Sequence, residues 1–431
     1  METNVANGSN LALTQYSVAL TAQMIRAPGN LNSLTGPAPK QADAENAIKL
    51  QTDPGMPFVR VTDLATDPKG DTVTVDAFDV VGGKPIMGDR NAEGRGVKLT
   101  SSTFNCRIDL ATFNVDAGGK MSRQRTRHDL RRIAKAELAA YYPRLLWQRA
   151  ITHLAGARGN QAGVSWDLPV STDPDFADIM VNPVLAPTRN RHLVVNASNI
   201  YRGGEQVASI ATTDVWKLAI LDNLAALLDA AETRLPPPRL TGDKQAFDAP
   251  LKGLLFLPPS SYNQLITDIS SSTSNLRAYQ AAAMERGKWS GDHPIFQGEV
   301  GIWRGIVVKK MDHTIYFDSA GSYNYVTAAN MLTETETTGA VNTIGANYQV
   351  ERGILLGAQA LARCEGSSNS GVPAAIIENT YNAGRNYEYL GEFMGGERKF
   401  RFYYPNANGD KQPTDNGVYV IDACAPKIAV M

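Results

Sequence analysis

A glycine-rich, charged segment at residues 82–96 constrains the fold of this chain more than any other feature. Five of its fifteen residues are glycine, and few of the others suit a core. Two strand-like runs flank it. Residues 71–75 are rich in β-branched side chains, and over 104–110 apolar residues alternate with polar ones. We therefore predict a long β-hairpin whose tip projects away from any core. Because two strands alone are marginally stable, this projection needs a partner surface.

The first 57 residues predict an extended arm. Prolines and glycines gather in its second half. Because proline fixes φ and removes a backbone donor, the segment should lack a core of its own. Such an arm is either disordered or lies on another surface.

Residues 122–155 predict one long helix, since apolar residues recur there at spacings of three and four. Pro143 should bend or break it, and Gly156 should end it. Its first half is basic, with Lys120, Arg123, Arg125, Arg127, Arg131, Arg132 and Lys135. These residues either contact phosphate groups or form a solvated face, with salt bridges to acidic neighbours. No aromatic residues interleave with them, so base stacking is not indicated.

The rest of the chain predicts a mixture of helices and strands, and therefore an α+β class. Helices are expected over 214–234, with Thr213 as the N-cap, from Ser260 or Ser261 to Ile269, and over 275–286. Strands are expected over 253–257, 302–310, 399–404 and 418–421.

Composition narrows the class of protein. The chain has 431 residues and a net charge of −1, so we expect more than one domain and no strongly basic nucleic-acid binder. Three cysteines lie far apart, which argues against disulfides and a structural zinc site. The N-terminus has no secretion signal, and no apolar run approaches the ~18 residues of a membrane helix. We expect a soluble protein made in a cytoplasm.

We find no motif for catalysis, metal or cofactor binding. The five histidines form no HExxH or HxH pattern, and the chain has neither a phosphate-binding GxxxxGK[ST] loop nor a GxSxG elbow. Residues 156–163 only superficially resemble a dinucleotide loop, because they follow a helix. The positive features are architectural and indicate a subunit that interlocks with others. Two alternatives stay open: an enzyme with dispersed catalytic residues, and a nucleic-acid-binding module using residues 123–135.

Several local sequences resemble one known family, the major capsid proteins of tailed bacteriophages, in particular a podovirus coat-protein family. The similarity spans about residues 60–430. Its most specific motifs are GDTVTV at 70–75, GKPIMGD at 83–89, GGKMSRQRT at 118–126 followed by DLR at 129–131, and HLAGARG at 153–159. Weaker matches are HPIF at 293–296, through Gly301 and Gly305, and LLGAQA at 355–360.

The resemblance implies the tailed-phage (Hong Kong-type) capsid fold, shared with herpesvirus capsids. On this chain it predicts an N-terminal arm at 1–57 and an extended β-hairpin loop with flanking strands at 58–116. A peripheral domain with the long spine helix would cover 117–210, and an axial domain 211–384. Residues 385–431 would return as strands to the peripheral domain.

The resemblance also implies a function: many copies, in pentamers and hexamers, form an icosahedral shell around double-stranded DNA. DNA contact would be weak and non-specific. Portal, scaffolding or decoration proteins are further expected partners. We expect no membrane contact and no cofactor. We expect location in the virion after assembly in the host cytoplasm. An encapsulin-like compartment of the same fold is the alternative. Candidate intersubunit residues are Lys84, Asp89, Arg90, Glu93, Arg95, Arg123, Arg125, Arg131 and Arg132.

Overall fold

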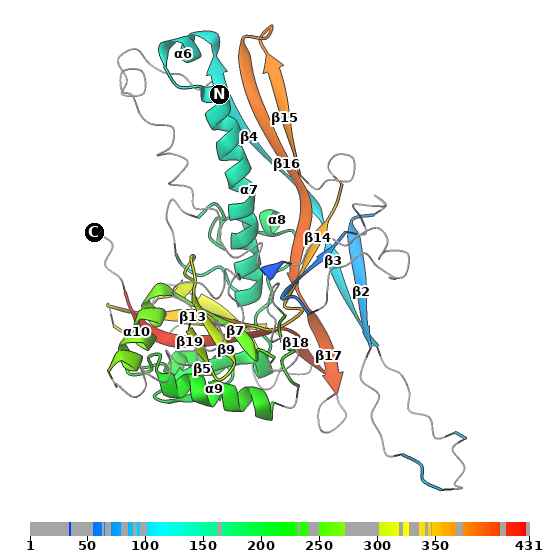
Figure 1. Ribbon diagram of the computed structural model, residues 1–431, viewed down its shortest axis with the longest axis vertical. Coiled ribbons are helices and arrows are strands. Elements are labelled where there is room, and N and C mark those ends of the chain that lie inside the picture. The colour runs from blue at the N-terminus through cyan, green and yellow to red at the C-terminus, as the bar shows by residue number, and fades with distance from the viewer. Residues whose placement is uncertain are drawn as a thin grey trace.

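The computed structural model has an elongated region and a more compact region (Figure 1). In the elongated region a long helix runs beside a long β-hairpin, and in the compact region a pair of helices packs on the largest sheet. The structure describes residues 34–35, 55–62, 64, 70–78, 85–88, 93–94, 101–161, 166–231, 233–239, 250–271, 301–318, 322–326, 336–340, 344–345, 347–367, 374–405 and 411–427.

The predicted long helix is two helices, α6 (Lys120–Arg125) and α7 (Leu130–Ala155). The single-helix prediction is wrong at 126–129, where Thr126 is extended and Asp129 caps α7 by accepting bonds from the main-chain N–H groups of Arg131 and Arg132. We name α7 the spine helix. The helix is not broken at Pro143. Buried side chains on both sides of the proline, such as Tyr142 and Leu145, hold the flanking turns in place.

Gly156 ends the spine helix, as predicted. Its φ is +67°, and its N–H donates to the Thr152 carbonyl at 3.0 Å. A Cβ at this position would lie 2.6 Å from the Leu185 carbonyl oxygen. Both the left-handed backbone and the close approach therefore require glycine.

A five-stranded sheet lies against the spine helix. Its order is β1 (Phe58–Val61), β14 (Leu361–Glu365), β16 (Asn386–Lys399) and β15 (Ala374–Tyr381), and β4 (Asp109–Gly119) also pairs with β16. Tyr389 and Phe393 of β16 share a buried cluster with Leu138 of the spine helix. The Tyr142 hydroxyl donates to the Gly391 carbonyl at 2.7 Å. These contacts fix the long β15–β16 hairpin on the helix.

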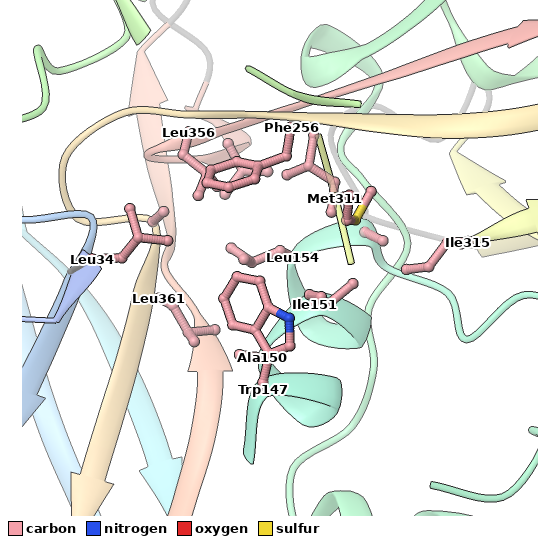
Figure 2. Packing of buried hydrophobic residues seen from close by; sticks show 14 of the residues in the cluster. Leu34, Trp147, Ala150, Ile151, Leu154, Phe256, Met311, Ile315, Leu356 and Leu361 are labelled. Atoms are coloured by element: carbon pink, nitrogen blue, oxygen red, sulfur yellow. The ribbon is translucent and has the colours of Figure 1, made fainter. Parts of the chain in front are cut away.

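The eight-stranded sheet forms the compact region. Its order is β6 (Asn199–Arg202), β5 (His192–Asn196), β19 (Val418–Pro426), β13 (Tyr348–Leu356), β7 (Gly253–Leu257), β9 (Ile306–Lys310) and β8 (Gly301–Trp303), with β10 (Tyr316–Phe317) beside β13. Helices α9 (Leu218–Ala230) and α10 (Pro259–Ser270) cover one face of this sheet. Their buried residues form a core cluster with Leu255 of β7. Trp147, Ile151 and Leu154 of the spine helix pack with Phe256 and Leu356 of the sheet (Figure 2).

Three two-stranded sheets complete the strands of the described chain. They are β2 (Thr72–Phe78) with β3 (Ser101–Arg107), β11 (Ser322–Val326) with β12 (Glu336–Ala340), and β17 (Arg401–Pro405) with β18 (Lys411–Asp415). The short helix α8 (Phe176–Met180) and two 3-10 turns, Arg189–Arg191 and Gly204–Ser209, lie between the large elements.

Several predicted elements are confirmed. The hairpin around residues 82–96 is β2 and β3, the strand at 253–257 is β7, and α10 covers the helix predicted to end at Ile269. The last predicted strand, 418–421, lies within β19. The helix expected over 275–286 lies outside the described residues.

Two further local predictions are wrong. The strand at 302–310 is a hairpin, because Arg304 and Gly305 both have positive φ and form the turn between β8 and β9. Thr213 does not cap the next helix, which begins at Leu218. The Asp214 carboxylate instead accepts bonds from the Ala197 and Ala211 N–H groups, which holds this stretch as a turn.

Candidate assembly surfaces

The β2–β3 hairpin has an anchored base. Its antiparallel register runs from Thr72 opposite Arg107 to Phe78 opposite Ser101. At the base, Phe104 is buried and its ring centroid lies 4.8 Å from that of Phe400. The hairpin therefore emerges in a direction that the body of the molecule sets, although among the described strands β2 and β3 pair with each other alone.

The loop at the end of this hairpin is exposed where the structure describes it. Pro85–Gly88 and Glu93–Gly94 are exposed, and the relative accessibility of Met87 is 69%. Of the candidate residues here, Glu93 is described. Lys84, Asp89, Arg90 and Arg95 lie outside the described residues.

The basic residues at the start of the spine helix divide into two groups. Arg131 donates to the Tyr389 hydroxyl at 3.0 Å and pairs with Glu378 of β15, which Lys135 also approaches at 3.3 Å. The guanidinium carbons of Arg131 and Arg123 lie 4.0 and 4.4 Å from the centroid of the Tyr387 ring. Arg131 and Arg123 therefore help to bind the β15–β16 hairpin to the helices.

Arg125 and Arg132 form the second group, because both side chains are exposed. The structure thus brings Arg123 and Arg131 together at the Tyr387 ring and leaves Arg125 and Arg132 exposed. Salt bridges to acidic neighbours, one of the two roles considered for this basic run, occur at Arg131 and Lys135. Burial acts to raise the pKa of Glu378, but its bonds from Lys135 and Arg131 outweigh this effect and lower the pKa.

Sequence reasoning missed the β15–β16 hairpin. Its turn holds Asn382, Ala383 and Gly384, all with positive φ. An Asn-x-Gly turn between runs of alternating residues was the available signal. The hairpin also leaves exposed apolar side chains on the sheet, Ile376 and Ile377 on β15 and Leu110 on β4.

Buried ionic groups hold the compact region together. Asp422 of β19 accepts bonds from Arg352 at 2.8 Å and lies 2.7 Å from His192 Nε2, with all three side chains fully buried. Asp415 similarly pairs with Lys399 at 2.8 Å and Arg401 at 2.7 Å. A histidine–carboxylate pair is common in catalytic sites, but full burial keeps substrate away from this one. Its role is to join strands.

The cysteines, the possible metal ligands and the helices of the described chain relate to three of the sequence expectations. The three cysteines are buried and form no disulfide bond. Within the described ranges, no group of three or more histidine, cysteine, aspartate or glutamate residues is arranged to hold a metal ion. No described helix combines the length and apolar character needed to span a bilayer.

Comparison with solved structures identifies the fold. The capsid of Ralstonia phage GP4 aligns with a TM-score of 0.71 at 22% identity, covering 100% of both chains. The Cyanophage Pam1 capsid gives a TM-score of 0.59 at 17% identity, with coverage of 99% of this chain and 98% of that one. The head of Helicobacter pylori bacteriophage KHP40 gives 0.55 at 13% identity, with coverage of 97% and 96%. The fold is therefore that of tailed-phage capsid subunits.

The family follows from the sequence itself. A family model described as phage capsid protein matches residues 4–427, nearly the whole chain, and the chain belongs to this family. A comparison with curated proteins gave no match. The protein is a major capsid protein, a structural component of the virion that forms the shell. The predicted α+β capsid fold and the predicted role as a major capsid protein are thus confirmed.

Proposed function

We propose that pentamers and hexamers of this chain build an icosahedral shell around packaged double-stranded DNA, without catalytic turnover. The observation that carries the proposal is the β2–β3 hairpin, which is anchored at its base and bears an exposed apolar residue, Met87, near its tip. A neighbouring copy would supply the covering surface. The charged loop residues Lys84, Asp89, Arg90, Glu93 and Arg95 would fix the register of this contact.

The domain assignment belongs to this proposal. Residues 117–210 would make the peripheral domain, joined by the strands of 385–431, and residues 211–384 the axial domain. Packing of β16 on the spine helix supports the first grouping. The large sheet spans both groupings, since β13 of the 211–384 range pairs with β19 of the last range within it.

Contact with DNA would come from the exposed arginines. Arg125 and Arg132 are accessible, whereas Arg131 is bound to Tyr389 and Glu378. With a net charge of −1, the subunit would hold DNA weakly and non-specifically. Assembly in the host cytoplasm, and contacts with portal, scaffolding or decoration proteins, belong to the same proposal.

Negative-stain electron microscopy of the expressed protein tests the proposal. The full chain should form closed particles. A variant with residues 82–96 replaced by a two-residue turn should remain a folded, soluble subunit by circular dichroism and form none. Normal particles from this variant would refute the role of the hairpin. Particles that enclose protein cargo and no DNA would favour the encapsulin-like alternative.

The DNA contact has its own test. The double variant Arg125→Glu and Arg132→Glu should weaken DNA binding by the subunit and flatten its dependence on salt, because fewer counterions are released. Unchanged binding and an unchanged salt slope would leave both arginines without a role in DNA contact.

A further inference from the structure

A pocket of about 540 Å³ lies in the compact region. Its wall is formed by helix α10, by residues 215–217 ahead of α9, and by Pro426 at the end of β19. Asn263 and Thr267 of α10 are exposed at its rim, as is Pro426. The pocket is therefore accessible to a segment that arrives from the end of β19.

Two polar atoms of this wall are buried without a hydrogen bond. Trp216 is fully buried, and its indole Nε1 has no hydrogen-bond partner among the described residues. The side-chain oxygen Oε1 of Gln264 on α10 is likewise buried and unbonded there. An indole N–H can only donate, and an amide oxygen can only accept. Because burying either group unbonded is costly, the pocket suits an occupant that supplies both an acceptor and a donor.

The rest of the wall favours an uncharged occupant. The Asp268 carboxylate already accepts from the Leu218 N–H at 2.8 Å, where it holds the start of α9. Val215 and Pro426 add apolar surface beside Trp216. Each peptide group carries one carbonyl and one N–H. An apolar peptide segment therefore matches both the apolar surface and the two unbonded atoms.

The chain itself brings such a segment to the rim. β19 ends at Pro426, and the N–H of Lys427 donates to the Asn347 carbonyl at 2.8 Å, which holds the chain there. The sequence continues as Ile-Ala-Val-Met over 428–431, which lie outside the described residues. Four extended residues reach about 13 Å. The α10 side of the pocket, residues 263–271, is about 12 Å long at a helical rise of about 1.5 Å per residue, so this uncharged segment is long enough to cross it.

We propose that residues 428–431 of the same chain occupy the pocket between α10, residues 215–217 and Pro426. One main-chain carbonyl of the segment accepts from Trp216 Nε1, and one main-chain N–H donates to Gln264 Oε1. The apolar side chains of the segment pack on the apolar part of the wall. The contact fastens the end of β19 to α10 within one subunit, so it is present before any shell assembles.

Nuclear magnetic resonance of the unassembled subunit with isotope-labelled tryptophan tests this contact, because the indole N–H signal of Trp216 responds to its hydrogen bond. Deletion of residues 428–431 should shift this signal. The signals of Trp147 and of Trp303, whose N–H donates to Asp222 at 2.8 Å, should stay in place and report that the subunit is folded. An unmoved Trp216 signal in the deletion variant overturns the proposal.

The double variant Ile428→Asp with Val430→Asp keeps the length of the chain and provides a second test of the same signal. It should reproduce the shift of Trp216, because charged side chains are costly to bury against an apolar wall. A double variant that keeps the wild-type signal contradicts the contact.

A mixing experiment identifies which copy supplies the segment. Unlabelled full-length subunit, added to the labelled deletion variant, should leave the Trp216 signal of that variant shifted, because a segment bound within its own chain is not shared. Recovery of the wild-type signal would assign the segment to a second copy and overturn the proposal.

Hydrogen exchange gives an independent test through the acceptor. Gln264→Ala removes Oε1 and should speed the exchange of one main-chain amide within residues 428–431 about fivefold, the net value of one hydrogen bond. Asn263→Ala, at the exposed neighbouring position, is the matched control and should leave this exchange unchanged. Equal rates in the wild type and Gln264→Ala, or equal acceleration by both substitutions, contradict the contact.

Discussion

At the scale of single residues, buried charges decide how strands far apart in sequence are joined. Asp422 bonds with Arg352 and His192 at a site with no exposure to solvent. Burial alone would raise the pKa of Asp422, but the adjacent Arg352 and His192 hold it well below its usual range. The carboxylate is therefore ionised in the folded subunit, and its charge compensates the buried guanidinium.

Asp422→Asn should lower the free energy of unfolding by about 3–5 kcal/mol, because it leaves the Arg352 charge buried without a counterion. Urea unfolding of the unassembled subunit measures this effect. The control Asp229→Asn removes a carboxylate that pairs with Lys252 at the surface, and it should cost at most about 1 kcal/mol. Similar small losses in both variants would show that the buried pair contributes little.

The same carboxylate predicts a dependence on pH. A depressed pKa contributes stability that is fully present above the unfolded value of about 4 and is lost as pH falls toward the folded value. Wild-type stability should therefore decrease below about pH 4. The Asp422→Asn variant should show a shallower decrease, measured by urea unfolding across pH 2.5–7 (roughly the range where this carboxylate titrates). Parallel curves would assign the acid sensitivity to other groups.

At the scale of elements, the spine helix tolerates a proline that its sequence alone predicts to be disruptive. Pro143 is exposed, while Tyr142 and Leu145 beside it are buried. Tyr142 also bonds to Gly391 of β16. Packing on the sheet therefore outweighs the missing backbone hydrogen bond, and the helix continues to Gly156.

Pro143→Ala should raise the free energy of unfolding by about 1–3 kcal/mol, because alanine restores the N–H donor and removes the clash with the preceding turn. Thermal or urea unfolding of the subunit measures the gain. Ala140→Gly, in the same helix, is the opposing control and should lower stability by about 1 kcal/mol. A loss of stability in Pro143→Ala would mean that a bend at the proline positions the packed half of the helix.

At the scale of the whole molecule, a portion of the predicted arm lies on the body of its own chain. Leu34 is fully buried in the main core, and Thr35 forms a bridge with Phe58. Figure 2 shows Leu34 beside Leu361. Met56 is buried as well, and its carbonyl accepts from the Gln359 N–H at 3.0 Å. The described part of the predicted arm therefore packs within its own subunit.

Deletion of residues 1–33 should leave the stability of the isolated subunit nearly unchanged, whereas Leu34→Ala should cost about 2–5 kcal/mol through the cavity it creates. Urea unfolding compares the two variants, and electron microscopy then reports whether the truncated subunit still assembles. Equal stability of Leu34→Ala and the wild type would show that the buried leucine contributes no packing energy.

The sequence by itself determined the elements whose signals are local. The β2–β3 hairpin, β7 and the end of the spine helix at Gly156 follow from alternation, an apolar run and a left-handed glycine. Family motifs likewise identified the capsid fold, which the whole-chain family match confirms.

Only the tertiary structure decided which of the predicted contact residues are available. Arg131 and Arg132 are adjacent and chemically alike, yet one bonds to Tyr389, 258 positions away, and the other is exposed. That difference depends on the pairing of β16 with β4 and on how the helix packs over it. Local periodicity encodes which backbone forms, but long-range pairing determines which side chains meet, and the pairing of β19 with β13 also brings Pro426 to the pocket beside α10.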